Sequence, residues 1–246
     1  MDVLPVSSRA DMEKTIDGIM HRNNIRSTVR LTGIPQNKVK AIVMQVGKAC
    51  ERHHAMHVKA HGNGKLRCGV TKVLHEKIHG SVQDPRRHLA IGSAWTWTCI
   101  DIETRFVSSW FVAPRNAEIA RRFLTEARET GGQVEMVGNE TIAYDVADND
   151  KLTRIFGSAD GYLSTIEPPE RPTFRSDPSC RIDESWLGAI PYGFARKVHR
   201  HSATLALFFA YHNFVSRDSS GRVSPAMAAG ITNRIWRVSD IAGLVW

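Results

Sequence analysis

The sequence predicts a chain of mixed α/β class, with a helical N-terminal domain followed by a domain that contains a mixed sheet. Apolar residues recur at helical spacing up to about residue 60, and two aromatic, β-branched segments follow after residue 94. Stretches rich in glycine (61–64) and proline (166–177) interrupt the pattern. The length of 246 residues accommodates one large domain or two small ones, and the composition of 42% hydrophobic and 24% charged residues excludes wholesale disorder.

The N-terminal domain, residues 1–60, is expected to hold three helices. Apolar residues mark one face of each: Met12, Ile16, Ile19 and Met20 in the first, Ile25 and Val29 in the second, and Val39, Ile42, Val43 and Val46 in the third. Between the last two, Thr32-Gly33-Ile34 predicts a tight turn, because glycine adopts positive φ at little cost. Pro35 suits the first turn of the helix that follows. Two helices joined by a short glycine turn form the helix-turn-helix pattern.

Positive charge is concentrated in this domain. Residues 1–65 hold 11 Lys and Arg and 5 Asp and Glu, a net charge of +6 out of +8 for the chain. A basic module with a helix-turn-helix pattern indicates double-stranded DNA as the partner, whereas the alternative is a three-helix bundle with a solvated charged face. The residues expected to contact bases and phosphates are Gln36, Asn37, Lys38 and Lys40 on the third helix, flanked by Arg26 and Arg30.

The second domain is assigned to residues 66–215, and residues 216–246 are taken as a C-terminal tail. The predicted elements are strands at 95–100 and 105–112 joined by a turn at 101–104, a helix at 115–127, a strand at 134–137 and a long helix at about 194–214. Within the turn, Asp101 and Glu103 are expected to serve the hairpin and not catalysis.

A histidine-rich segment follows the third helix. Spacings of four, three and four residues place Cys50, His54, His57 and His61 on one helical face, where they are candidate zinc ligands with Cys68 as a further one. The alternative is a linker helix whose histidines face solvent. The four cysteines of the chain lie far apart without a CxxC pair, which favours a reducing compartment. Neither a secretory signal nor an apolar run of 18 residues is found, so we expect a cytoplasmic protein without a membrane span.

Several sequence blocks occur in the order typical of one family. They are Arg30–Ile34, Gly47–Cys50, Trp95–Thr98 with Ile100-Asp101, Ser109–Val112, Tyr211–Val215 and Ser224–Gly230. Over roughly residues 10–241 the chain resembles bacterial transposases of the insertion-sequence-1 family. The resemblance implies a helix-turn-helix that binds the terminal inverted repeats of an insertion sequence, assembly of a homo-oligomer on DNA, and an RNase-H-like domain whose Asp, Asp, Glu triad holds Mg²⁺ for strand cleavage and transfer.

The triad itself is altered in this chain. The family's first aspartate corresponds to His75, which is followed by Glu76, and the second corresponds to Asn139. The third acidic position falls near Phe174 and Arg175, where the sequence does not align with the family. Asparagine keeps the shape of aspartate without its charge, and histidine is a poor ligand for a hard cation.

Three interpretations therefore remain open. An active transposase would need another carboxylate set, such as Glu76 with Glu140 and Glu184. An inactive relic would act only as a DNA-binding protein or repressor. A decayed gene product that folds poorly is the third.

Overall fold

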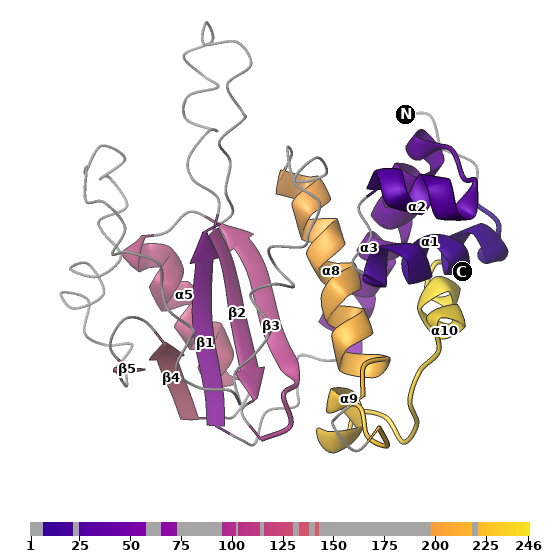
Figure 1. Ribbon diagram of the computed structural model, residues 1–246. Coiled ribbons are helices and arrows are strands. Elements are labelled where there is room, and N and C mark those ends of the chain that lie inside the picture. The colour runs from indigo at the N-terminus through magenta and orange to yellow at the C-terminus, as the bar shows by residue number, and fades with distance from the viewer. Residues whose placement is uncertain are drawn as a thin grey trace, which may run out of the picture. The chain divides into compact units, whose positions relative to one another are not determined.

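The computed structural model (Figure 1) describes the backbone of residues 7–21, 25–57, 65–72, 95–101, 103–113, 116–129, 133–137, 141–142, 198–217 and 221–246. The chain divides into two compact units. One unit combines Met1–Lys59 with Ile182–Trp246, and the other is Ala60–Arg181. The α/β class is confirmed, because helices and a mixed sheet are both present.

The first unit begins with the three predicted helices. They are α1 (Arg9–Met20), α2 (Ile25–Thr32) and α3 (Gln36–His57). Ser8 caps α1, because its hydroxyl accepts a hydrogen bond of 3.2 Å from the backbone N–H of Asp11. Nine of the ten apolar residues predicted to line these helices are buried, and Val29 is half-buried. The helical periodicity therefore identified the core of this part of the unit correctly.

The turn between α2 and α3 has the predicted glycine geometry. Gly33 has a φ of 71°, and its N–H donates to the carbonyl oxygen of Val29 at 2.9 Å, which ends α2. Thr32 holds both sides of this turn: its hydroxyl donates to the carbonyl of Thr28 at 2.7 Å and accepts from the N–H of Ile34 at 3.2 Å. Local hydrogen bonds thus fix the conformation of the turn that leads from α2 into α3.

C-terminal helices complete the same unit. They are α8 (Val198–Phe214), α9 (Pro225–Ala228) and α10 (Val238–Gly243). The backbones of α3 and α8 approach so closely at Gly47 that an added Cβ would lie 2.6 Å from the backbone carbon of Ala203. Helix α10 packs on α1, and the guanidinium of Arg9 donates to the carbonyl of Ser239 at 2.9 Å.

This division differs from the domain boundaries expected from the sequence. The long helix was expected in the α/β domain, at 66–215, and residues 216–246 were expected to form a tail. In the structure α8 packs on α3, and the residues after it hold α9 and α10. The physical reason is that residues 203–209 of α8 are all buried. A helix that is buried on every side has no single apolar stripe that would identify its partner.

The second unit contains a five-stranded sheet with the order β3-β2-β1-β4-β5. Its elements are β1 (Lys65–Lys72), β2 (Trp95–Asp101), β3 (Val107–Ala113), α5 (Ala117–Glu129), β4 (Gln133–Val137) and β5 (Thr141–Ile142). Strands β1, β2 and β3 are antiparallel, whereas β4 runs parallel to β1 and β5 antiparallel to β4. The predicted hairpin, helix and strand are confirmed, while β1 and β5 were not foreseen.

Helix α5 covers one face of this sheet (Figure 1). Its buried stripe includes Phe123, whose ring centroid lies 5.6 Å from that of Trp97 on β2. At the hairpin, the Asp101 carboxylate accepts hydrogen bonds from the N–H groups of Glu103 and Thr104 at 2.9 and 3.1 Å. Arg105 then adopts a φ of 60° to complete the turn. Asp101 therefore has the predicted turn role.

We expect Gly47→Ala to destabilise the first unit by about 1–3 kcal/mol, because the new methyl group would force the α3 and α8 backbones apart. Chemical denaturation followed by circular dichroism measures this change. The matched control is Gly243→Ala on α10, where the new Cβ would meet only the tip of Arg9 at 3.8 Å. If both variants unfold at the same denaturant concentration as the parent, the close helix contact is not stabilising.

Candidate nucleic-acid interface

The orientation of α3 determines which of its side chains are available to a ligand. Val39, Ile42 and Val46 are fully buried, so this side of the helix faces the core. Gln36, Asn37 and Lys38 are exposed in the first turn, and Lys40 is half-buried in the second. The structure thus places all four predicted α3 contacts outside the core, at the N-terminal end of the helix.

Lys38 forms an ion pair that could not be predicted from the sequence. Its Nζ lies 2.7 Å from Oδ2 of Asp11 on α1. The hydrogen bond from Lys38, together with one from Ser8, holds the pKa of the Asp11 carboxyl below its ordinary value. Lys38 therefore turns toward α1 and fixes the first turn of α3 against it. We therefore expect Lys38 to act on a ligand mainly by holding the first turn of α3 next to α1.

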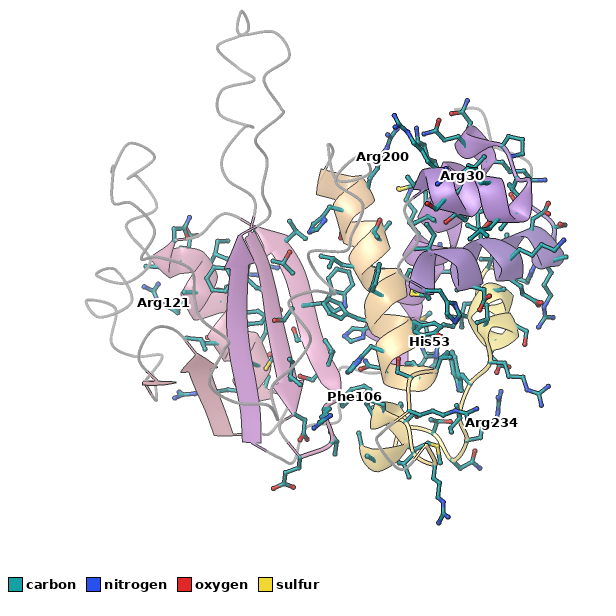
Figure 2. All side chains as sticks on the ribbon, viewed as in Figure 1. Arg30, His53, Phe106, Arg121, Arg200 and Arg234 are labelled. Atoms are coloured by element: carbon teal, nitrogen blue, oxygen red, sulfur yellow. The ribbon has the colours of Figure 1, made fainter. Side chains whose placement is uncertain are left out.

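The two flanking arginines lie on α2. Arg26 and Arg30 are both exposed, and the guanidinium of Arg30 donates to the hydroxyl of Ser27 at 3.2 Å (Figure 2). Along α2, the turn and α3, residues 25–57 contain six Lys and Arg and a single acidic residue, Glu51. A surface of this composition attracts a polyanion.

Sequence reasoning missed three residues on the outer side of α3. Ala41 and Met44 are half-exposed and Lys48 is exposed, and they follow Asn37 at intervals of four, seven and eleven residues. With 100° per residue, the four side chains fall within about 60° of arc. The same helical periodicity that found the buried stripe also identifies this opposite stripe.

The proposed zinc ligands do not come together in the described residues. Burial raises the pKa of the Cys50 thiol to about 12, so the thiolate that zinc requires is strongly disfavoured. His54 is half-buried and His57 exposed, whereas His61 and the Cys68 side chain lie outside the described parts of the structure. Across those parts, no three His, Cys, Asp or Glu side chains gather in a way that could hold a metal ion.

His53 belongs instead to an aromatic cluster with Phe214 and Trp236. The centroids of the stacked Phe214 and Trp236 rings are 4.3 Å apart, and the His53 ring is T-shaped to both, at centroid distances of 5.5 and 5.2 Å. The His57 ring lies 4.8 Å from that of His53 on its other side. Burial first, and the neighbouring His57 second, lower the pKa of His53.

The catalytic positions implied by the resemblance, His75, Glu76 and Asn139, lie outside the described residues. Their sequence positions can still be given relative to two strands of the sheet. His75 comes three residues after the end of β1, and Asn139 comes two residues after the end of β4. β1 contains no Asp or Glu, and β4 contains only Glu135. In the described turn of this unit, the Asp101 carboxylate is already occupied by backbone N–H groups.

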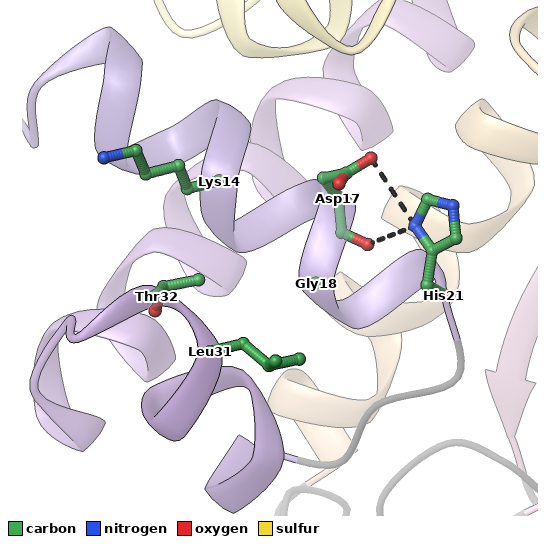
Figure 3. A pocket seen from close by; sticks show the side chains of 6 residues that line it. All are labelled: Lys14, Asp17, Gly18, His21, Leu31 and Thr32. Atoms are coloured by element: carbon green, nitrogen blue, oxygen red, sulfur yellow. Dashed lines mark hydrogen bonds and ion pairs between the residues drawn. The ribbon is translucent and has the colours of Figure 1, made fainter.

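A surface pocket of about 410 Å³ lies between α1 and α2 (Figure 3). Nδ1 of His21 lies 2.8 Å from the carbonyl oxygen of Asp17 and 3.5 Å from its carboxylate, and both side chains are more than 60% exposed. These contacts terminate α1, since His21 is its C-cap residue. Two of the polar residues that line the pocket, Asp17 and His21, therefore serve the end of α1.

Comparison with known proteins gave no match to a family model, to a curated protein or to a solved structure. The described helices include none that is both long and apolar enough to span a bilayer.

We expect the stability of the first unit to fall as the pH drops below about 6.5, the ordinary pKa of histidine. Because the folded pKa of His53 is depressed, the unfolded chain binds the proton first, and stability is lost until the pH passes the folded pKa. Unfolding free energies measured between pH 8 and 5 test this. The His53→Phe variant should lose less stability over this range than the parent; an identical pH profile would contradict the role of His53.

Proposed function

We propose that this chain is a transposase-like DNA-binding protein whose helix-turn-helix binds the terminal inverted repeats of an insertion sequence. The observation that carries the proposal is the geometry of α2, the Gly33 turn and α3, with its exposed polar first turn. In helix-turn-helix proteins the N-terminal residues of the second helix reach base edges in the major groove, while the first helix lies across the backbone. Gln36, Asn37 and Lys40 occupy the former position and Arg26 and Arg30 the latter.

The charge of this region supports a nucleic acid as the partner. Six basic residues and one acidic residue in 25–57 give an excess of five positive charges over α2, the turn and α3. Each phosphate neutralised by such a residue releases counterions, so binding weakens steeply as salt rises. The sequence blocks shared with insertion-sequence-1 transposases direct the proposal to transposon ends, where such proteins act as homo-oligomers.

We expect the affinity of the full chain for duplex DNA to fall linearly with salt on logarithmic axes. Lys40→Ala and the Arg26→Ala, Arg30→Ala pair should each weaken binding and reduce the slope by about one unit per lost phosphate contact. Fluorescence anisotropy between about 50 and 200 mM salt is the measurement. The control is Arg122→Ala, which removes an exposed arginine from α5 in the other unit.

A salt-independent affinity, or an equal loss in the Arg122→Ala control, would contradict the proposal. Lys38→Ala is a separate probe because its partner is Asp11. We expect this variant to affect binding mainly through the position of α3, and Asp11→Asn should then reproduce much of its effect.

A second candidate function is Mg²⁺-dependent strand cleavage and transfer. The order β3-β2-β1-β4-β5, with β4 parallel to β1 after α5, is compatible with the RNase-H-like sheet that the resemblance implies. The carboxyl ends of adjacent parallel strands are also where α/β proteins place their ligands. The strand order is thus one support for this second candidate function.

The residues at the two triad positions that the resemblance implies do not fit a two-magnesium site. Mg²⁺ in such sites is held by carboxylates, whereas the two triad positions after β1 and β4 are His75 and Asn139. Glu76 follows the first position and Glu140 the second, so each position has one acidic neighbour in the sequence. We therefore favour the alternative in which the chain occupies transposon ends without cutting them, as a repressor does.

We expect no nicking of supercoiled or transposon-end DNA by the full chain in Mg²⁺. The measurement is a gel assay, with a Glu76→Ala variant prepared in parallel. If the parent nicks DNA in Mg²⁺ and the Glu76→Ala variant does not, an alternative carboxylate set supports catalysis. That result would overturn the interpretation that the chain is inactive.

A further inference from the structure

We infer that α3 reads adenine·thymine base pairs, through the carboxamide of Asn37 and the apolar side chains of Ala41 and Met44. This inference rests on the proposed function, since it requires α3 to lie in the major groove. It goes further by naming the bases that the helix prefers and the atoms by which it recognises them.

The geometry of α3 selects these residues. Val39, Ile42 and Val46 point into the core, so the helical arc opposite them faces outward. Asn37, Ala41, Met44 and Lys48 lie on that outward arc, and all four are at least partly exposed. Lys38 lies on one flank of this arc, where its Nζ is 2.7 Å from the Asp11 carboxylate.

The remainder of α3 is not equally available to a groove. At Gly47 one side of the helix contacts α8, and further along His53 on α3 contacts Phe214 and Trp236, whereas Lys48, Glu51 and Ala55 on the other side stay exposed. In helix-turn-helix proteins the N-terminal part of this helix enters the groove, so the inference concerns the first three turns of α3.

The chemistry of this arc matches one base pair better than the other. A carboxamide forms two hydrogen bonds with N7 and the N6 amino group of adenine, and small apolar groups contact the C5 methyl of thymine. An acidic side chain that could accept from the cytosine amino group first occurs at Glu51, beyond the Gly47 contact. Gln36 on the flank adds a second carboxamide, while Lys48 and Lys40 suit phosphates or guanine.

The first experiment selects duplexes from a random pool with the full chain. We expect the selected sequences to share a core of adenine·thymine pairs. Asn37→Ala should lose the preference at one adenine by about 5- to 150-fold, the range measured for a bidentate base contact. Circular dichroism confirms that each variant is folded.

The second experiment removes thymine methyl groups. Replacing thymine by uracil in a selected duplex deletes only the C5 methyl, and we expect about a fourfold loss of affinity for each contacted methyl. Met44→Ala should abolish part of this loss. The matched control is Met56→Ala on the same helix, a methionine that is 69% exposed and lies beyond the Gly47 contact; it should retain the full effect of uracil.

The outcomes separate this inference from the proposed function. If no duplex is bound at any salt concentration, the proposed function fails. If duplex is bound with the expected salt dependence but uracil has no effect, or Asn37→Ala selects the same sequences as the parent, the base preference is overturned and DNA binding stands. A uracil effect that is equal in the Met44→Ala and Met56→Ala variants also overturns it.

Discussion

The first unit depends on the contact between α3 and α8 at Gly47. Without a Cβ at this position, the backbone of α3 approaches the carbonyl group of Ala203 directly. A larger side chain would separate two helices whose facing surfaces include Val46, Leu205 and other fully buried residues. Interiors are close-packed, so such a separation is not absorbed locally. The orientation of α3, and with it the position of its exposed first turns, is therefore fixed by residues more than 150 positions later in the chain.

The C-terminal segment reinforces this arrangement mainly through its rings. Phe214, Trp236 and His53 form mutual contacts at centroid distances of 4.3 to 5.5 Å, and aromatic pairs of this kind contribute about 0.5–1.5 kcal/mol each beyond their buried area. Arg234 binds both carboxylate oxygens of Asp240 and helps to lower the pKa of that group to about 2, but the arginine of this pair is exposed. Exposed ion pairs contribute less than about 1 kcal/mol. This ion pair also lies within the C-terminal segment, whereas the ring cluster joins that segment to His53 on α3.

Local sequence patterns predicted several helices and turns correctly. They did not predict contacts between residues that are far apart in the chain. The stripes of α1 to α3, the Gly33 turn and the Asp101 hairpin each follow from neighbours within a few residues, and each was predictable. The Lys38–Asp11 pair joins residues 27 positions apart, and no periodicity reveals it. Ala41 and Met44 were overlooked because apolar residues usually lie in the core. Only the burial of Val39, Ile42 and Val46 on the opposite side of α3 shows that Ala41 and Met44 face outward. For α8, seven consecutive buried residues concealed which helix it packs against.

The division into units separates the two activities that the resemblance implies. The helices that position α3 all come from Met1–Lys59 and Ile182–Trp246, whereas both altered triad positions fall in Ala60–Arg181. Under the proposed function, DNA binding therefore does not require the carboxylates that cleavage requires. Replacing aspartate by His75 and Asn139 removes negative charge from one unit and leaves the groove-reading residues of the other unchanged. Under the proposed function, a protein divided in this way needs no metal ligands for its affinity for DNA, and it competes with an active enzyme for the same ends.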